Sequence, residues 1–309
     1  MKRKNKGILL GMAASCTYGT NPLFALPLFA LGMGVNSVLF YRYFFAVVLF
    51  GIWLHFFKKT SLRISWKDAA LLFFLGTMFS ISSLTLFIGY TYVGAGIAST
   101  ILFVYPIFVA VIMAVFFKEK ISFKTIISIV LMSAGIILFY KGDDGKSLNM
   151  WGITSVLISA ASYALYMICL KKMPQVKHIH FPVLTFYVMF FGLFVFLANL
   201  KFGLNLQKIE SPFMLGCVLG AALIPTIISL ETMNVAIKFI GPTLAAILGA
   251  LEPVTAVFIG VLVFGESMTL RIAAGICLIL CSVLLLMIDD HKKAQQQTRW
   301  QKFISLFRR

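Results

Sequence analysis

The sequence predicts an all-α integral membrane protein with ten transmembrane helices, arranged as two inverted-topology repeats of five helices each. Two observations carry this prediction. Hydrophobic residues make up 61% of the 309 residues and charged residues only 12%, with a mean hydropathy of +0.98, whereas a soluble domain carries about twice that charge. A proline-to-glutamate spacing also occurs twice, from Pro106 to Glu119 and from Pro253 to Glu266. A pattern shared by two halves of a chain indicates an internal repeat.

The apolar segments of the chain are candidate transmembrane helices, because a helix that crosses the bilayer needs about 20 apolar residues. Some segments are shorter or longer than this, and helix tilt can absorb the difference. The segments cover residues 7–31, 37–57, 69–93, 97–117, 125–140, 151–170, 181–200, 213–237, 242–264 and 272–288. They use nearly all of the chain, so no soluble catalytic domain is expected.

Basic residues between these segments are distributed unequally. If the N-terminus is cytoplasmic, the far side of the membrane receives only Lys141, Lys146, Lys201, Lys208 and Arg271. Apart from Arg42, which lies inside a span, every other Lys and Arg then falls on the cytoplasmic side. The positive-inside rule therefore predicts that the N- and C-termini are both cytoplasmic.

The repeat extends beyond the proline-to-glutamate spacing. Residues 7–18 align with residues 152–163, which places residues 1–145 over residues 146–290 as two five-span domains. Since five is odd, the second copy enters the membrane from the opposite side, and in such pairs the substrate site lies near the midplane between the repeats. The alignment also identifies the basic, apolar start as a retained first span rather than a signal peptide. Residues 291–309 form a basic cytoplasmic tail, either a short amphipathic helix or a disordered segment.

Several functional classes are excluded by what the chain lacks. The five cysteines lie in apolar segments without disulfide or zinc spacing, and the four histidines show no metal-binding spacing. The net charge of +17 comes from basic residues that punctuate the spans, whereas a nucleic-acid-binding protein gathers them on one folded face. We therefore expect neither an enzyme nor a cofactor, a metal or a nucleic-acid partner.

In this order, the features resemble the drug/metabolite transporter superfamily, in particular its ten-helix members built from two EamA domains. The resemblance covers essentially the whole chain and depends on an ordered set of residues rather than on one specific motif. These are Pro106 with Glu119, Leu251-Glu252-Pro253 with Glu266, the small-residue stretches 94–99 and 241–246, and Arg42 in the second span. The resemblance implies an inner-membrane transporter, often an exporter, of small metabolites such as amino acids or related compounds.

Two charged residues inside the spans are the first candidates for a substrate site. Glu252 lies about 15 Å into its span, near the middle of the bilayer. A carboxylate there costs about 2.5–3.5 kcal/mol, so it should be paired, facing water or protonated, unless it only packs around the irregularity at Pro253. Arg42 lies about 9 Å deep, where its side chain would reach outward to the interface. The difference in depth of about 6 Å also allows an Arg42–Glu252 pair, as a gate or substrate anchor.

Tyrosine and amide side chains at matched places in the repeats form a second group of candidates. The matched pairs are Tyr18 with Tyr163, Asn21 with Tyr166, and Tyr105 with Glu252. Such residues suit an amphipathic ligand, since they combine apolar contact with orienting hydrogen bonds, although aromatic residues in spans more often pack or contact lipid. Nearer the cytoplasmic end, Glu231 would be solvated or would neutralise Lys238, and Asn234 would join helices or contribute to the cavity.

Prolines inside the spans predict helix breaks. Pro22, Pro106, Pro225 and Pro253 each free backbone carbonyls at membrane depth, which is tolerated where protein or a wet cavity satisfies them. Hinged helices would meet the mechanical requirement of alternating access. Static kinks that serve packing are the equally open alternative.

The sequence thus predicts a secondary-active transporter that exports small amphipathic metabolites, amino-acid-like or related, by alternating access. An importer or exchanger of the same architecture, and a non-transporting channel or scaffold, are the alternatives. The expected partners are a small-molecule substrate and the lipid bilayer, with coupling to a proton or ion left open. The sequence does not determine the substrate or the oligomeric state.

Overall fold

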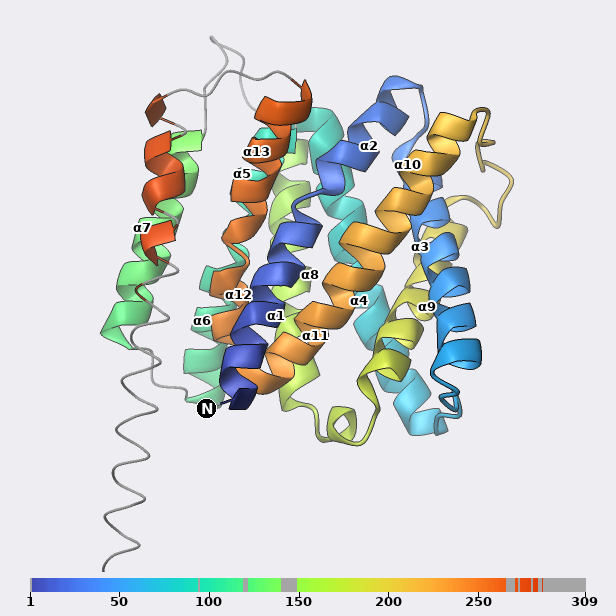
Figure 1. Cartoon of the computed structure of the whole chain (residues 1–309), viewed down its shortest axis with the longest axis horizontal. Coiled ribbons are helices and arrows are strands. Elements are labelled where there is room, and N and C mark those ends of the chain that lie inside the picture. Colours follow the sequence, from blue (N-terminus) through green and yellow to red (C-terminus); the bar gives the residue numbers. More distant parts are fainter. Residues whose placement is uncertain are drawn as a thin grey trace, which may run out of the picture.

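All secondary structure in the described part of the chain is helical, and the helices stand side by side as a bundle (Figure 1). The structure is a computed structural model that describes residues 2–93, 95–118, 122–139 and 149–264, with short stretches between 270 and 285. Within these residues, six helical stretches are long and apolar enough to cross a membrane. They are Val35–Phe57, Trp66–Val93, Met150–Lys172, Phe181–Asn199, Pro212–Ile240 and Pro242–Val263. The predicted all-α membrane fold is confirmed.

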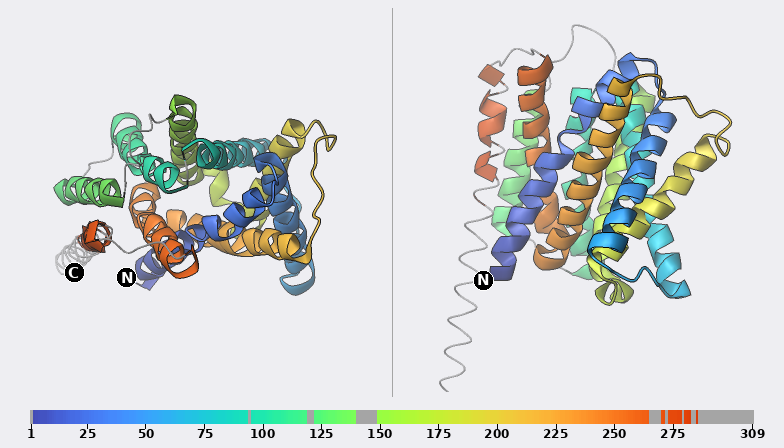
Figure 2. Two further views of the ribbon diagram at one scale, coloured as in Figure 1. Left: turned by 90° about the horizontal axis from the view of Figure 1, so that it is seen from above. Right: turned by 45° about the vertical axis from the view of Figure 1, so that its right-hand side comes forward.

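The first half of the chain contributes helices from α1 to α7. They are α1 (Lys2–Tyr18), α2 (Asn21–Ala30), α3 (Val35–Ile52) with its π-helical extension η1 (Trp53–Phe57), α4 (Trp66–Val93), α5 (Ala95–Leu102), α6 (Tyr105–Phe117) and α7 (Phe123–Phe139). Seen from above, α7 lies at one edge of an elongated bundle (Figure 2).

The second half contributes helices from α8 to α13. They are α8 (Met150–Lys172), the short 3₁₀ turn η2 (Pro174–Lys177), α9 (Phe181–Asn199), α10 (Pro212–Ala222), the π-helical turn η3 (Leu223–Ile228), α11 (Ser229–Ile240), α12 (Pro242–Leu248) and α13 (Leu251–Phe264). The expected span 272–288 lies largely outside the described residues. Gly94, Glu119, Glu266 and the tail 291–309 also lie outside them.

Four of the expected spans are interrupted along their length, and Figure 1 shows the break between α1 and α2. The first span divides into α1 and α2, the fourth into α5 and α6, and the ninth into α12 and α13, while η3 interrupts the eighth. A proline lies at each interruption. Pro22 and Pro106 are the second residues of α2 and α6, Pro253 is the third residue of α13, and Pro225 lies in η3. Proline is tolerated at the start of a helix because its missing N–H would have no intrahelical acceptor there, so these positions allow a new helical segment to begin. Their movement as hinges stays a prediction.

The first helices of the two halves cross the bundle in opposite directions. α1 begins at the lower edge of Figure 1, whereas α8 ends near that edge, where η2 turns the chain into α9. The loop from α9 to α10 lies at the upper edge. This antiparallel placement is what an inverted repeat requires.

Two helix pairs form the centre of the bundle, α4 along α8 and α1 along α11. Leu72, Leu75 and Leu86 of α4 and Val156 of α8 are fully buried. Gly89 allows the close approach of α4 to α8, because a Cβ atom at this position would overlap the side chain of Val156. Small residues are the usual means of bringing membrane helices together, since lipid provides no hydrophobic drive for association.

Candidate functional site at the helix breaks

Arg42 of α3 is fully buried and is bound by groups at two of the helix breaks. Its Nη1 donates to Asn21 Oδ1 at 2.8 Å, Nε donates to Thr226 Oγ1 at 2.5 Å, and Nη2 donates to the Pro225 carbonyl at 3.3 Å. Asn21 begins α2, while Pro225 and Thr226 belong to η3. The expectation that Arg42 reaches outward to the interface is therefore wrong, because neutral acceptors inside the bundle hold its guanidinium.

The proline of η3 explains why Thr226 is available to Arg42. Pro225 has no N–H to donate to the carbonyl of Ala221, four residues earlier. The Thr226 hydroxyl donates to that carbonyl instead, at 2.7 Å. Its only proton is thereby used, so its lone pairs are left to accept from Arg42. Thr226 was not identified from the sequence, although its position directly after an intramembrane proline was the available signal.

Aromatic rings surround the same guanidinium. The Arg42 Cζ atom lies 5.6 Å from the centroid of the Phe87 ring and 5.9 Å from those of Tyr18 and Tyr43. Cation–π attraction at such distances is stronger in a desolvated site than at an exposed one. The buried positive charge is thus stabilised by rings and neutral oxygen atoms.

Glu252 lies directly after the break between α12 and α13 and is only 7% exposed. Within the described part of the chain, no ion pair of 4.0 Å or less joins its carboxylate to Arg42. Tyr18 lies within electrostatic range of both charged groups. The two residues therefore border the same region without pairing in this structure.

Tyrosine rings form a wall beside Glu252. Tyr18, Tyr90, Tyr105 and Tyr163 all lie within electrostatic range of its carboxylate. The Tyr105 and Tyr163 rings meet edge to face with centroids 5.0 Å apart, and Tyr163 stacks with Tyr166 at 6.2 Å. Tyr18 and Tyr163, matched between the repeats, are each only partly buried.

Tyr105 also locks two helix breaks together. Its hydroxyl donates to the carbonyl of Ala246 at 3.0 Å. The hydroxyl packs directly over Gly249, where any Cβ atom would overlap it. The residue that starts α6 is therefore fixed against the break between α12 and α13.

Gly19 brings the break of the first span equally close to the ninth span. A Cβ atom at this position would meet the Glu252 carbonyl oxygen at 2.5 Å. Only a residue without a side chain fits such a distance.

A second polar group links α8, α9 and α11. The Tyr166 hydroxyl donates to Asn234 Oδ1, Asn234 Nδ2 donates to Thr185 Oγ1 at 3.0 Å, and the Thr185 hydroxyl donates to Glu231. The Lys238 ammonium instead lies 4.3 Å from the centroid of the Phe181 ring. Glu231 is thus half-buried and bound to Thr185, and the expectation that it neutralises Lys238 is not met. Thr185 was missed by the sequence reasoning, since a single threonine in an apolar span carries no distinguishing signal.

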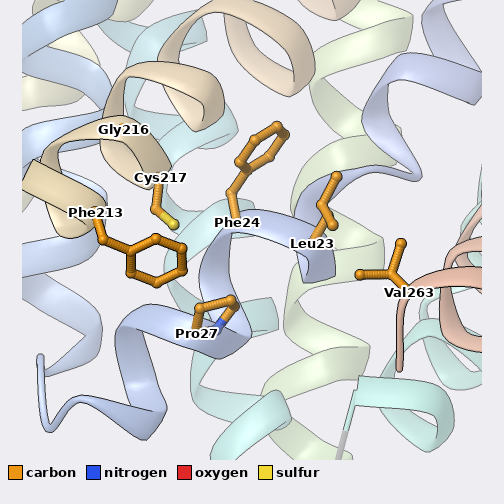
Figure 3. Close-up of a pocket in the computed structure, with 7 residues that line it drawn as sticks. All are labelled: Leu23, Phe24, Pro27, Phe213, Gly216, Cys217 and Val263. Carbon is orange, nitrogen blue, oxygen red and sulfur yellow. The ribbon is translucent and has the colours of Figure 1, made fainter. Parts of the chain in front are cut away.

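A separate apolar cavity of about 480 Å³ lies between α2, α10 and α13 (Figure 3). It is lined by Leu23, Phe24, Pro27, Phe213, Gly216, Cys217 and Val263. None of the residues bound to Arg42 lines it, so the cavity and the polar cluster are different features. Among the described residues, no group of three His, Cys, Asp or Glu side chains is placed to hold a metal ion.

Sequence comparison finds several relatives that are named uncharacterized transporters. An uncharacterized transporter of Bacillus subtilis (strain 168), YcbK, is 27% identical over 257 residues, covering 78% of this chain and 80% of that protein. A second, YdfC, is 28% identical over 212 residues, or 68% of each chain. An uncharacterized transporter of Archaeoglobus fulgidus is 31% identical over 106 residues, and this match spans only 37% of that protein.

A solved crystal structure shares the fold with a TM-score of 0.75, covering 94% of this chain and 99% of its own. Its sequence identity of 14% limits that likeness to the fold. The model of the EamA-like transporter family matches the sequence twice, over residues 5–141 and 150–288. Since the two matches together span most of both halves, the chain belongs to the EamA-like transporter family.

Proposed function

We propose that this transporter is secondary-active and exports small amphipathic metabolites, amino-acid-like or related, by alternating access. The observation that carries the proposal is that buried charged side chains and tyrosine rings lie together at the helix breaks. Arg42 and Glu252 are the charged residues, and Tyr18, Tyr105 and Tyr163 form the aromatic wall. A ligand with one polar and one apolar end would contact both groups at once.

The breaks also support a mechanism with movable half-helices. Tyr105 is the first residue of α6 and Glu252 the second residue of α13. Arg42 binds Asn21 at the start of α2 and Thr226 in η3. Rotation at Pro22, Pro106, Pro225 and Pro253 would change the site and its access together. Alternating access in inverted-repeat transporters uses rocking of this kind around a fixed midplane site.

Within this proposal the residues have distinct roles. Arg42, Asn21 and Glu252 orient the substrate, and the tyrosines contact its apolar part. Asn234 and Glu231 hold Tyr166 in position instead of contacting the substrate. Asn234 accepts a hydrogen bond from the Tyr166 hydroxyl, and Thr185 connects Asn234 to Glu231. The two five-span repeats, residues 1–145 and 146–290, are the two units that move relative to each other.

The proposed location is a bacterial-type inner membrane with both termini in the cytoplasm. The distribution of basic residues supports this orientation, because the loops on one side contain most of the Lys and Arg residues. Cysteine-accessibility labelling of single cysteines in the loops would test it. Labelling of the 59–65 loop from outside intact cells would contradict the proposal.

Counterflow in proteoliposomes tests the transport mechanism. We expect saturable exchange of a radiolabelled amphipathic metabolite, with a panel of amino acids and related compounds tested with and without a pH gradient. A channel would give flux that does not saturate and shows no counterflow, and a scaffold would give no flux. Net movement in vesicles of known orientation separates an exporter from an importer or exchanger.

A further inference from the structure

We infer that Arg42 and Asn21 form a carboxylate-binding site, which the carboxylate of a substrate occupies during transport. The inference rests on the proposed transport function and names the substrate class: compounds that join a carboxylate to an apolar body. The first observation is that Arg42 has more N–H donors than hydrogen bonds to the described residues. A guanidinium has five N–H donors, and the described residues accept three hydrogen bonds from this one.

Every acceptor of Arg42 is neutral. They are an amide oxygen, a hydroxyl and a backbone carbonyl, and among the described residues no carboxylate lies within ion-pair distance of this fully buried cation. A buried charge without a partner of opposite sign is costly, so proteins normally pair it. The missing component is therefore an anion.

Asn21 adds an independent observation. It is only 3% exposed, its Oδ1 is used by Arg42, and its Nδ2 is buried without a hydrogen-bond partner among the residues that the structure describes. Since Oδ1 and Nδ2 share one amide group, this free donor lies next to the guanidinium. A native protein rarely leaves such a group unsatisfied, and a carboxylate with two acceptor oxygens would satisfy both Asn21 and Arg42.

The position of Asn21 strengthens the same preference. It is the first residue of α2, and Thr20 before it makes no side-chain capping bond. The positive end of the helix dipole favours negative charge at this point. Pro22 has no N–H and the Leu23 N–H donates to the Thr20 carbonyl at 3.0 Å, so α2 contributes positive potential while Arg42 and Asn21 supply the donors.

The surrounding rings define the rest of the ligand. Phe87, Tyr18 and Tyr43 lie against the guanidinium, and Phe87 stacks with Tyr90 at a centroid distance of 5.2 Å. An apolar group attached to the carboxylate would contact these rings. Inorganic anions would gain only the polar part of the site.

A carboxylate could come from two sources, a free substrate or Glu252 of the chain itself. The experiment separates them with matched probes of one side chain: leucine, 4-methylpentanoate and leucinamide. The purified full-length protein is examined by thermal unfolding in detergent and by inhibition of counterflow. We expect both carboxylate probes to stabilise the wild type and to inhibit at concentrations about tenfold lower than leucinamide does, since a charge-assisted, bidentate bond is lost in the amide.

Variants then test which residue is responsible for the preference for a carboxylate over an amide. Arg42→Gln should abolish the carboxylate preference, and Arg42→Lys should retain part of it because the charge remains without the planar fork. Exposed Arg63→Gln, in the loop before α4, is the matched control and should retain all of it. Glu252→Gln should keep the wild-type preference for acid over amide if the substrate occupies the site. A preference that appears only in Glu252→Gln would assign the site to Glu252, and this result, like an equal response of the wild type to acid and amide, overturns the inference.

Asn21→Asp keeps the test decisive if Arg42→Gln does not fold. This nearly isosteric change places a permanent carboxylate beside Arg42, so the melting temperature should not fall while the response to added carboxylate disappears. A normal response in a folded Asn21→Asp variant contradicts the site. Failure of transport itself would appear differently, as absence of saturable counterflow in the wild type despite a carboxylate-dependent thermal shift.

Discussion

The helix pairs α1 with α11 and α4 with α8 are built from corresponding spans of the two repeats but differ in continuity. In each pair, the first span of one repeat packs on the third span of the other. α4 and α8 run without interruption for 28 and 23 residues. The other pair is broken, because α2 begins after Gly19-Thr20 and η3 precedes α11. Spans that correspond in the repeat have therefore become a straight pair and a broken pair.

The two pairs also present different chemistry to the site. The straight pair contributes Phe79 and Tyr90 of α4 and Tyr163 and Tyr166 of α8 to the aromatic surroundings of the site, which Tyr18 of α1 and Tyr105 of α6 complete. The broken pair exposes backbone and polar groups at its interruptions, and these groups bind Arg42. An amphipathic site thus arises where the repeat symmetry is lost.

The largest expected effect comes from removing the hydroxyl that repairs the proline break. Thr226→Val leaves both Arg42 Nε and the Ala221 carbonyl without this partner. Each unsatisfied buried group costs about 1–3 kcal/mol, and transport should fall by at least about tenfold if Arg42 is displaced by that energy. Denaturant titration followed by circular dichroism and a counterflow assay measure the two effects.

Thr226→Ser is the matched control for that substitution. It keeps the hydroxyl and removes only a methyl group, so it should recover most of the stability and transport. A defect in the Ser variant with little or none in the Val variant would show that packing of the methyl group, rather than the hydroxyl, stabilises the broken pair.

A smaller effect is expected from crowding the straight pair. Gly89→Ala forces a methyl group against Val156 between α4 and α8, and overpacking of this kind costs about 1–3 kcal/mol. Gly216→Ala provides the control, because its added methyl group meets no atom within 4 Å. Unfolding in detergent should distinguish them, and similar stability of both variants would argue against close contact of α4 with α8.

Much of the fold follows from the sequence because hydrophobic length and repeat spacing report directly on membrane spans. The breaks at Pro22, Pro106, Pro225 and Pro253 also follow, since proline cannot donate in a helix. The prediction that Arg42 reaches outward to the interface was wrong because the sequence indicates only the depth of Arg42 along its helix. The side of the helix from which the residue projects depends on the helices that pack there, and hydrophobic periodicity indicates this side poorly in spans that are apolar on all sides.

The site partners were harder to predict than the charged residues. Glu252 was identified by its depth in an apolar span, and Tyr105 and Asn21 by their matched positions in the repeats; all three lie at helix breaks. Thr226 and Thr185 were missed because each acts through a hydroxyl whose importance depends on a neighbour from another span.

The smallest expected effect is on the polar contact of the straight pair. Ser159 Oγ donates to the Ser82 carbonyl at 2.7 Å and lies 3.1 Å from Ser82 Oγ, both buried between α4 and α8. Hydrogen bonds between membrane helices contribute about 0.6 kcal/mol on average, so Ser159→Ala should lower the unfolding free energy by about that amount and leave counterflow unchanged. The Ser82 carbonyl keeps its partner within α4, which is why the loss stays small compared with Thr226→Val. A transport defect in Ser159→Ala as large as that of Thr226→Val would mean that the straight pair moves or binds substrate as the broken pair does, and the contrast between the two pairs would not hold.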